Sequence, residues 1–152
     1  MSKAHGYRGY IGSRPYNGID FPQHVQNFLN RSFCQKNGYT FLLSATEYRM
    51  AGCYMILEEV VDSIELLEGI VLFSIFMLPQ SKKRRQHVYE SVLNAGRTLH
   101  AALEDINIRN WDDVQMVEDI LCMNKIALTD SMLPELENFL AMRTEIKDVA
   151  AA

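Results

Sequence analysis

Short apolar runs and longer segments with helical spacing alternate along this chain. The apolar runs are bounded by Gly, Pro, Asn or Ser, as strands in a sheet usually are. We therefore expect strands at 7–12, 39–45, 69–78 and 98–103. The second and third runs are apolar almost throughout, which is typical of strands that helices cover on both faces.

The segments between these runs have the periodicity of amphipathic helices. From Val25 to Phe33, apolar residues recur at spacings of three and four, which predicts a helix over 22–37. Pro22 suits the first turn of this helix, and Gly38 is well placed to end it. The same reasoning predicts helices over 53–67, 81–95, 111–125 and 134–146.

Strands that alternate with helices predict an α/β fold. We expect three layers, with a four-stranded, mostly parallel sheet joined by right-handed crossovers and followed by C-terminal helices. In one domain, 1–108 would form the α/β core and 109–147 would form C-terminal helices packed on that core. Residues 148–152 would be a flexible tail.

Composition and charge exclude several classes of protein. The chain has 152 residues, 48% of them hydrophobic, which is enough for one core and too apolar for disorder. Its net charge of −4 disfavours a nucleic-acid partner. The longest apolar run, 69–78, is too short to span a bilayer, and the N-terminus has no signal-peptide core. We expect a cytoplasmic protein without membrane insertion.

Metal and cofactor motifs are absent from the sequence. The three cysteines are scattered without a CxxC pair, and the four histidines show no HxxxH spacing, so we expect no disulfide framework and no metal. Neither GxGxxG nor GxxxxGK[ST] occurs, so we expect no dinucleotide and no P-loop, and hence no cofactor.

Polar residues gather in the loops after the first two predicted strands. The carboxyl ends of parallel strands meet at one edge of the sheet, where α/β proteins bind ligands. A turn at Asn17–Gly18 and a polar stretch over 44–52 would lie there together. The substrate-binding candidates in and beside these segments are Arg8, Arg14, Tyr16, Asn17, Gln23, Gln26, Ser44, Tyr48 and Arg49.

Three residues are candidates for catalysis. Ser13 could act as a nucleophile, although a serine after a strand also forms turns and caps. Glu47 or His24 would be the acid–base residue. Glu47 could equally form a surface ion pair with Arg49, and Arg14 could either grip a phosphate or be a solvated loop arginine.

Two further features have two interpretations each. Cys53 lies at a predicted helix start, where thiols become reactive, but it also suits a small buried position. The basic run over 82–85 could bind phosphate groups, but a solvated helix face explains it as well.

Three features of the sequence resemble the catalytic domain of serine recombinases, the resolvase-like fold. They are a strand that ends in a serine, a helix that bears glutamines, and the segment over 94–105. In that family the serine attacks a DNA phosphate and nearby arginines stabilise the charge, and Ser13 matches the serine. The family's arginine two residues earlier is Ile11 here, and 76–80 replaces an arginine-bearing segment. The resemblance therefore implies the fold and not recombinase activity.

Four other segments, 6–11, 22–27, 42–48 and 52–57, resemble a bacterial family of sporadic carbohydrate-cluster proteins. Those proteins are encoded among genes for surface-polysaccharide or lipopolysaccharide sugars. The resemblance implies a role in that biosynthesis, with a sugar phosphate or nucleotide-sugar as ligand. The alternative is a non-catalytic binding or scaffold protein, and in either case the C-terminal helices could form a homodimer.

Overall fold

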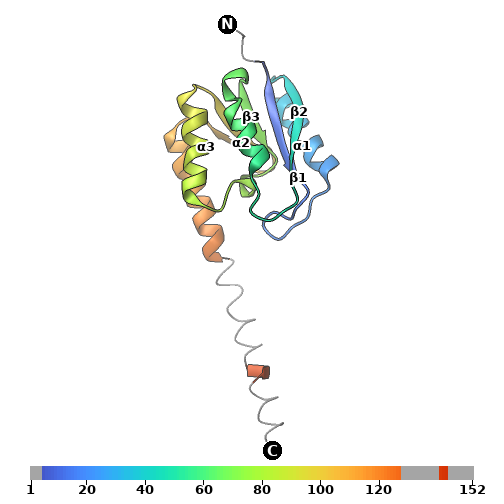
Figure 1. The fold of residues 1–152 in the computed structure, drawn as a ribbon, viewed down its shortest axis with the longest axis vertical. Coiled ribbons are helices and arrows are strands. Elements are labelled where there is room, and N and C mark those ends of the chain that lie inside the picture. Colours follow the sequence, from blue (N-terminus) through green and yellow to red (C-terminus); the bar gives the residue numbers. More distant parts are fainter. Residues whose placement is uncertain (1–4, 128–140, 144–152) are drawn as a thin grey trace, which may run out of the picture. The chain divides into compact units, whose positions relative to one another are not determined.

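A computed structural model describes residues 5–127 and 141–143 (Figure 1). Its contacts divide the chain into two units, Met1–Val114 and Gln115–Ala152. The first unit contains the whole sheet, and the described residues of the second, 115–127 and 141–143, are helical. The predicted tail and most of the predicted helix over 134–146 lie outside the described residues.

The first unit alternates strands and helices as predicted. Its regular elements are β1 (Tyr7–Gly12), α1 (Gln23–Lys36), β2 (Phe41–Glu47), α2 (Met55–Asp62), β3 (Gly69–Leu72), α3 (Lys82–Asn94), β4 (Thr98–Ala101) and β5 (Ile106–Ile108). Two short 3-10 turns, η1 (Ile64–Leu66) and η2 (Ile75–Met77), follow α2 and β3. β1 has the predicted bounds, and α1 and α3 each differ from the prediction by one residue at either end.

The sheet has the strand order β2-β1-β3-β4-β5. The four predicted strands pair in parallel, which confirms the mostly parallel α/β fold. The predicted number of strands was wrong, because β5 adds a fifth strand antiparallel to β4. A tight turn with a positive φ of 54° at Asp105 leads into β5, and its three residues are too few to show a periodicity in the sequence.

The strand β3 and the helix α2 are both shorter than the apolar segments from which they were predicted. β3 ends at Leu72 rather than at residue 78, because the Ser74 side chain caps η2 by accepting a hydrogen bond from the Phe76 amide. The Ser74 hydroxyl also donates to Glu104 over 2.6 Å. The predicted helix over 53–67 ends at Asp62 and continues as η1. Ile75 and Met77 stay buried outside the strand, so burial rather than strand pairing explains their apolar character.

The helices form two layers around the sheet (Figure 1). The chain crosses from β1 to β2 in one direction and then from β2 through β3 to β4 in the other. Right-handed crossovers place α1 on one face and α2 with α3 on the opposite face. α2 and α3 contact each other directly, and together with the sheet the helices make the predicted three layers.

The core lies on both faces of β3, whose four residues are all buried. On the α1 face, Phe33 and Cys34 pack against Val71. Burial raises the pKa of the Cys34 thiol to about 11, so this cysteine is a protonated core residue. Among the described residues, no helix combines the length and the apolarity that crossing a bilayer requires.

Candidate functional site

The loops that follow β1 and β2 meet at the carboxyl end of the sheet, as predicted. Arg14 Nη1 donates a hydrogen bond of 2.6 Å to the Met50 carbonyl oxygen, which joins the two loops directly. A cavity of about 430 Å³ opens there, and we call it the strand-end cavity. Its walls include Arg14, Tyr16, Asn17, Tyr54, Phe76 and Arg84.

Two arginines from different elements surround one aromatic ring in this cavity. The guanidinium carbon of Arg14 lies 4.7 Å from the centroid of the Tyr54 ring, and that of Arg84 lies 6.0 Å from the same centroid. Arg84 Nη1 also donates to the Gly52 carbonyl over a long distance of 3.5 Å. Among the described residues that line the cavity, none is acidic, so the wall carries a net positive charge.

Tyr16 is held over the end of β1 by a tight turn. Asn17 and Gly18 both have positive φ values, 53° and 76°, which is the signature of a type I′ turn, and this confirms the predicted turn. The turn folds Tyr16 back over Gly12, where any Cβ would collide with the Tyr16 hydroxyl. Glycine is therefore required at that position.

The Tyr16 hydroxyl and Arg14 Nη2 are buried polar groups that make no well-formed hydrogen bond with the described residues, although the Arg14 side chain is close enough to act on the Tyr16 hydroxyl. Burial raises the pKa of Tyr16 to about 12, although the neighbouring positive charge of Arg14 counteracts part of the rise. Tyr16 is therefore a neutral phenol at neutral pH. Buried polar groups normally have partners, so two unpaired ones beside a cavity mark this wall as unusual.

Glu47, a predicted acid–base residue, anchors the start of α2 instead of lining the cavity. Its carboxylate is only 2% exposed. The carboxylate accepts four hydrogen bonds of 2.7–3.2 Å, from the Tyr10 hydroxyl and from the backbone amides of Tyr48, Ile56 and Leu57. The amide groups at a helix start have no partner within the helix, and Glu47 supplies one. These contacts give Glu47 a structural role.

Gln26, a predicted ligand contact, fastens the end of β1. Its Nε2 donates to the carbonyl oxygens of Gly12 and Phe21 over 2.7 and 2.8 Å, and its Oε1 accepts from the Gly12 amide over 3.0 Å. The side chain is fully buried. Gln26 thus positions the loop that carries Arg14 and does not face the cavity.

Five other predicted residues do not line the cavity. Ser13 is half-buried directly after β1, while Gln23 and His24 are exposed on the first turn of α1. Tyr48 and Arg49 are exposed on the β2–α2 loop. The structure therefore brings Arg14, Tyr16 and Asn17 together at the cavity, but it places no predicted acid–base residue there.

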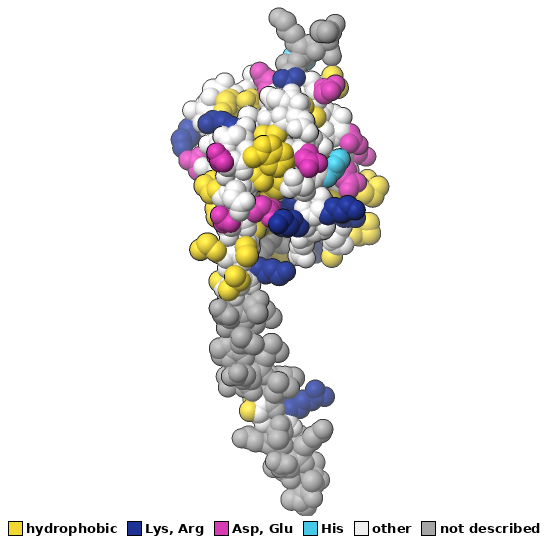
Figure 2. All heavy atoms as spheres, turned by 90° about the vertical axis from the view of Figure 1, so that its left-hand side faces the viewer, with side chains coloured by type: hydrophobic (Ala, Val, Ile, Leu, Met, Phe, Trp, Pro, Cys, Tyr) yellow, Lys and Arg dark blue, Asp and Glu magenta, His cyan; other side chains and the backbone are white. Residues whose placement is uncertain are grey.

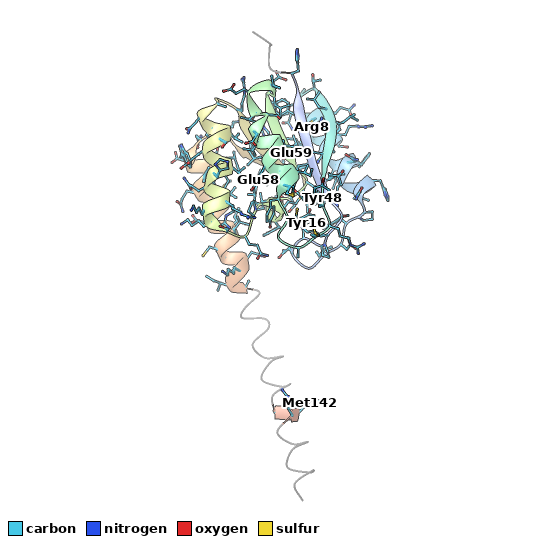
Figure 3. All side chains as sticks on the ribbon, viewed as in Figure 1. Arg8, Tyr16, Tyr48, Glu58, Glu59 and Met142 are labelled. Atoms are coloured by element: carbon cyan, nitrogen blue, oxygen red, sulfur yellow. The ribbon has the colours of Figure 1, made fainter. Side chains whose placement is uncertain are left out.

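Arg8 and Ser44 lie away from the strand-end cavity. Arg8 is at the opposite end of β1 from Tyr16 (Figure 3) and lines a separate cavity of about 420 Å³ beside α2. Ser44 lies within β2 and is directed at Gly9, and its buried hydroxyl has no partner among the described residues. Neither residue can act together with Arg14 on one small ligand.

Arg84 and Tyr54 are cavity residues that the sequence analysis did not select. Arg84 belongs to the basic run over 82–85, which opens α3 at the carboxyl end of the sheet. Positive charges at a helix start interact unfavourably with the helix dipole. The position of this basic run at the start of α3 was therefore the sequence signal that could have indicated a functional role for Arg84. Cys53 is half-buried, and its thiol contacts Glu47 Oε1 at 3.7 Å. No cluster among the described His, Cys, Asp and Glu residues could hold a metal ion.

Comparisons with known proteins bear on the fold. Neither a protein-family model nor a curated protein matches the sequence. A resolvase family site-specific recombinase from Streptococcus pneumoniae superposes with a TM-score of 0.54 at 12% identity, covering 91% of this chain and 99% of that one. The N-terminal catalytic domain of TP901-1 integrase superposes with a TM-score of 0.50 at 11% identity, covering 80% and 97%. The fold is resolvase-like. The resemblance to carbohydrate-cluster proteins stays a prediction.

Proposed function

We propose that this protein binds a phosphorylated sugar, either a sugar phosphate or a nucleotide-sugar, in the strand-end cavity. We further propose that it acts in bacterial surface-polysaccharide or lipopolysaccharide biosynthesis, a setting that rests on the sequence resemblance. The observation that carries the binding proposal is the convergence of Arg14 and Arg84 near Tyr54, in a cavity whose described lining residues include no acidic one.

Arginine suits phosphate because its planar guanidinium group donates several hydrogen bonds in a fixed geometry. Arg14 donates one hydrogen bond to the Met50 carbonyl oxygen, and this bond holds the guanidinium group in place before any ligand binds. A preorganised donor loses less conformational entropy on binding. The cavity also lies at the edge where α/β proteins bind ligands, next to the meeting point of β1, β2 and β3.

A non-catalytic role is the second candidate, and one observation favours it. Neither a carboxylate nor a histidine is among the described residues that line the cavity. Glu47, which would have supplied acid–base chemistry, uses its carboxylate to hold α2. Ser13 remains the nearest candidate nucleophile, but no base contacts it among the described residues. Its replacement by alanine therefore separates an enzyme from a binding protein.

A thermal-shift measurement tests the binding proposal, since a ligand that binds the folded state raises its melting temperature. We expect glucose 1-phosphate or uridine diphosphate glucose to raise the Tm of the full chain, and glucose to leave it unchanged. Arg14→Gln should abolish the shift. Arg49→Gln removes an exposed arginine from the neighbouring loop and should keep it. No shift with either phosphate compound, or an unchanged shift in Arg14→Gln, would disprove the site.

A second assay separates the resolvase-like fold from recombinase chemistry. A recombinase would form a covalent bond between its serine and a DNA phosphate. Incubation with supercoiled DNA followed by denaturing electrophoresis should show no protein–DNA adduct at Ser13. An adduct that disappears in Ser13→Ala would contradict the proposed function.

A further inference from the structure

The two guanidinium groups of the strand-end cavity stand on separate walls. Arg14 belongs to the β1–α1 loop and is half-buried, whereas Arg84 belongs to the first turn of α3 and is exposed. Each also holds a different carbonyl of the β2–α2 loop, that of Met50 and that of Gly52. The two guanidinium carbons lie 4.7 and 6.0 Å from the centroid of the same Tyr54 ring, so the cavity offers two cationic groups that separate elements position independently.

We infer that the cavity takes a diphosphate group, so that the ligand is a nucleoside diphosphate sugar and not a sugar monophosphate. The inference rests on the proposed function and narrows its ligand class. In a nucleoside diphosphate sugar, each of the two linked phosphoryl groups carries one negative charge. One guanidinium group can then pair with each phosphoryl group.

A sugar monophosphate matches this arrangement less well. A phosphate monoester concentrates about −1.5 to −2 charges on one group near neutral pH. To neutralise it, two guanidinium groups from separate elements would both have to contact one phosphoryl group. A diphosphate instead offers each guanidinium group a phosphoryl group of its own.

The rest of the cavity suits the groups at the two ends of such a ligand. Pro15, Tyr54 and Phe76 add apolar and aromatic surface beside the arginines. Aromatic faces stack on nucleobases without strict selectivity for the base. The volume of about 430 Å³ lies in the lower part of the usual range for ligand pockets, so one end of the ligand would extend into solvent.

Nucleic acid also carries monoanionic phosphate groups, so it is an alternative ligand for the two arginines. The net charge of the chain is −4. On the α3 side of the first unit, basic and acidic side chains are mixed and do not form a continuous basic patch (Figure 2). A nucleic-acid site would need a longer basic surface than one cavity with two arginines and the short basic run over 82–85. The observations favour the small diphosphate.

Isothermal titration calorimetry on the full chain tests the inference with four probes: uridine diphosphate glucose, inorganic pyrophosphate, glucose 1-phosphate and a single-stranded oligothymidylate. Pyrophosphate reports on the diphosphate site whatever base the ligand carries. We expect both diphosphates to bind about 10-fold or more tightly than glucose 1-phosphate, because a second charge-assisted contact is made.

Arg84→Gln should remove this preference. We expect the affinity for the diphosphates to fall about 10-fold and that for glucose 1-phosphate to change less than about 3-fold. The variant should fold, since Arg84 is exposed and the one described hydrogen bond of its guanidinium group is long. Lys83→Gln is the matched control, because it removes a neighbouring exposed charge of α3 that does not line the cavity.

The outcomes separate the inference from the proposed function. Equal affinities for glucose 1-phosphate and the diphosphates, or an unchanged preference in Arg84→Gln, would overturn the diphosphate inference and leave the phosphorylated-sugar proposal standing. Absence of binding by all four probes would overturn both. Tighter binding of the oligothymidylate than of either diphosphate would also overturn both, in favour of a nucleic-acid site.

Discussion

The end of β2 and the wall of the strand-end cavity are both polar, yet they use their hydrogen bonds in opposite ways. At the end of β2, each oxygen of the buried Glu47 carboxylate accepts at least two hydrogen bonds from neighbouring groups. In the cavity wall, Arg14 Nη2 and the Tyr16 hydroxyl are buried without a well-formed hydrogen bond among the described residues. The first region stabilises the fold, whereas the second leaves polar groups unsatisfied beneath the cavity surface.

The comparison teaches how to separate structural from functional polar residues in this fold. Both groups lie at the carboxyl ends of adjacent strands, where topology alone marks each as a site candidate. A buried polar group that is fully paired contributes to stability, whereas leaving one unpaired costs free energy unless something else compensates. Mutations in the first region should therefore lower stability, and mutations in the second should lower binding.

The strongest test of the comparison is Glu47→Ala. It leaves the Tyr10 hydroxyl and the first amides of α2 buried without an acceptor. We expect the free energy of unfolding to fall by about 3–5 kcal/mol, measured by urea denaturation. Glu59→Ala, an exposed carboxylate of α2, should change it by less than about 0.5 kcal/mol. Equal stabilities of the two variants would show that Glu47 is no anchor.

Gln26→Ala should give the next largest effect. The substitution removes three hydrogen bonds from the end of β1 and the following loop. We expect a loss of about 2 kcal/mol in the free energy of unfolding, measured in the same way. Gln23→Ala, on the exposed side of the first turn of α1, is the control and should have nearly wild-type stability.

His100 extends the comparison to a paired group that titrates. Its Nδ1 lies 2.6 Å from Asn107 Oδ1 and its Nε2 lies 2.9 Å from Thr98 Oγ1, and burial lowers its pKa. In the unfolded chain the His100 imidazole has a pKa of about 6.5. As the pH falls, it therefore binds a proton at a higher pH in the unfolded chain than in the folded chain. Stability should fall as the pH drops below that value, by at most about 1.4 kcal/mol per pH unit.

Unfolding by urea at pH 7.5 and pH 5.5 measures this dependence. In His100→Gln, which cannot titrate, the part of the slope that belongs to His100 should disappear. An identical pH dependence in the variant and the wild type would show that His100 does not control stability.

The smallest expected effect on stability belongs to Arg84→Gln. Its exposed guanidinium group makes one long bond to the protein, so the free energy of unfolding should change by less than about 0.5 kcal/mol. The same variant should nevertheless lose diphosphate binding. A loss of stability comparable to that of Gln26→Ala would place Arg84 among the structural residues and break the comparison.

Elements with a strong local pattern were predicted closely. The alternation of Tyr and Ile with Gly defined β1, and the Asn17–Gly18 pair defined a turn whose positive φ values these residues adopt easily. β5 was missed because three residues carry no periodicity and become a strand only by pairing with β4. The end of β3 was misplaced because Ser74 leaves the strand to cap η2, and a contact with Glu104, thirty residues away, accompanies this cap.

The candidate site shows the same division. The sequence by itself determined that the loops after the first two strands would meet, because parallel strands joined by right-handed crossovers bring their carboxyl ends to one edge. Only the tertiary structure decided which polar side chains at that edge have all their hydrogen bonds made within the protein and which do not. Hydrogen bonds such as that from Tyr10 to Glu47 join residues far apart in the chain, and no local pattern records them.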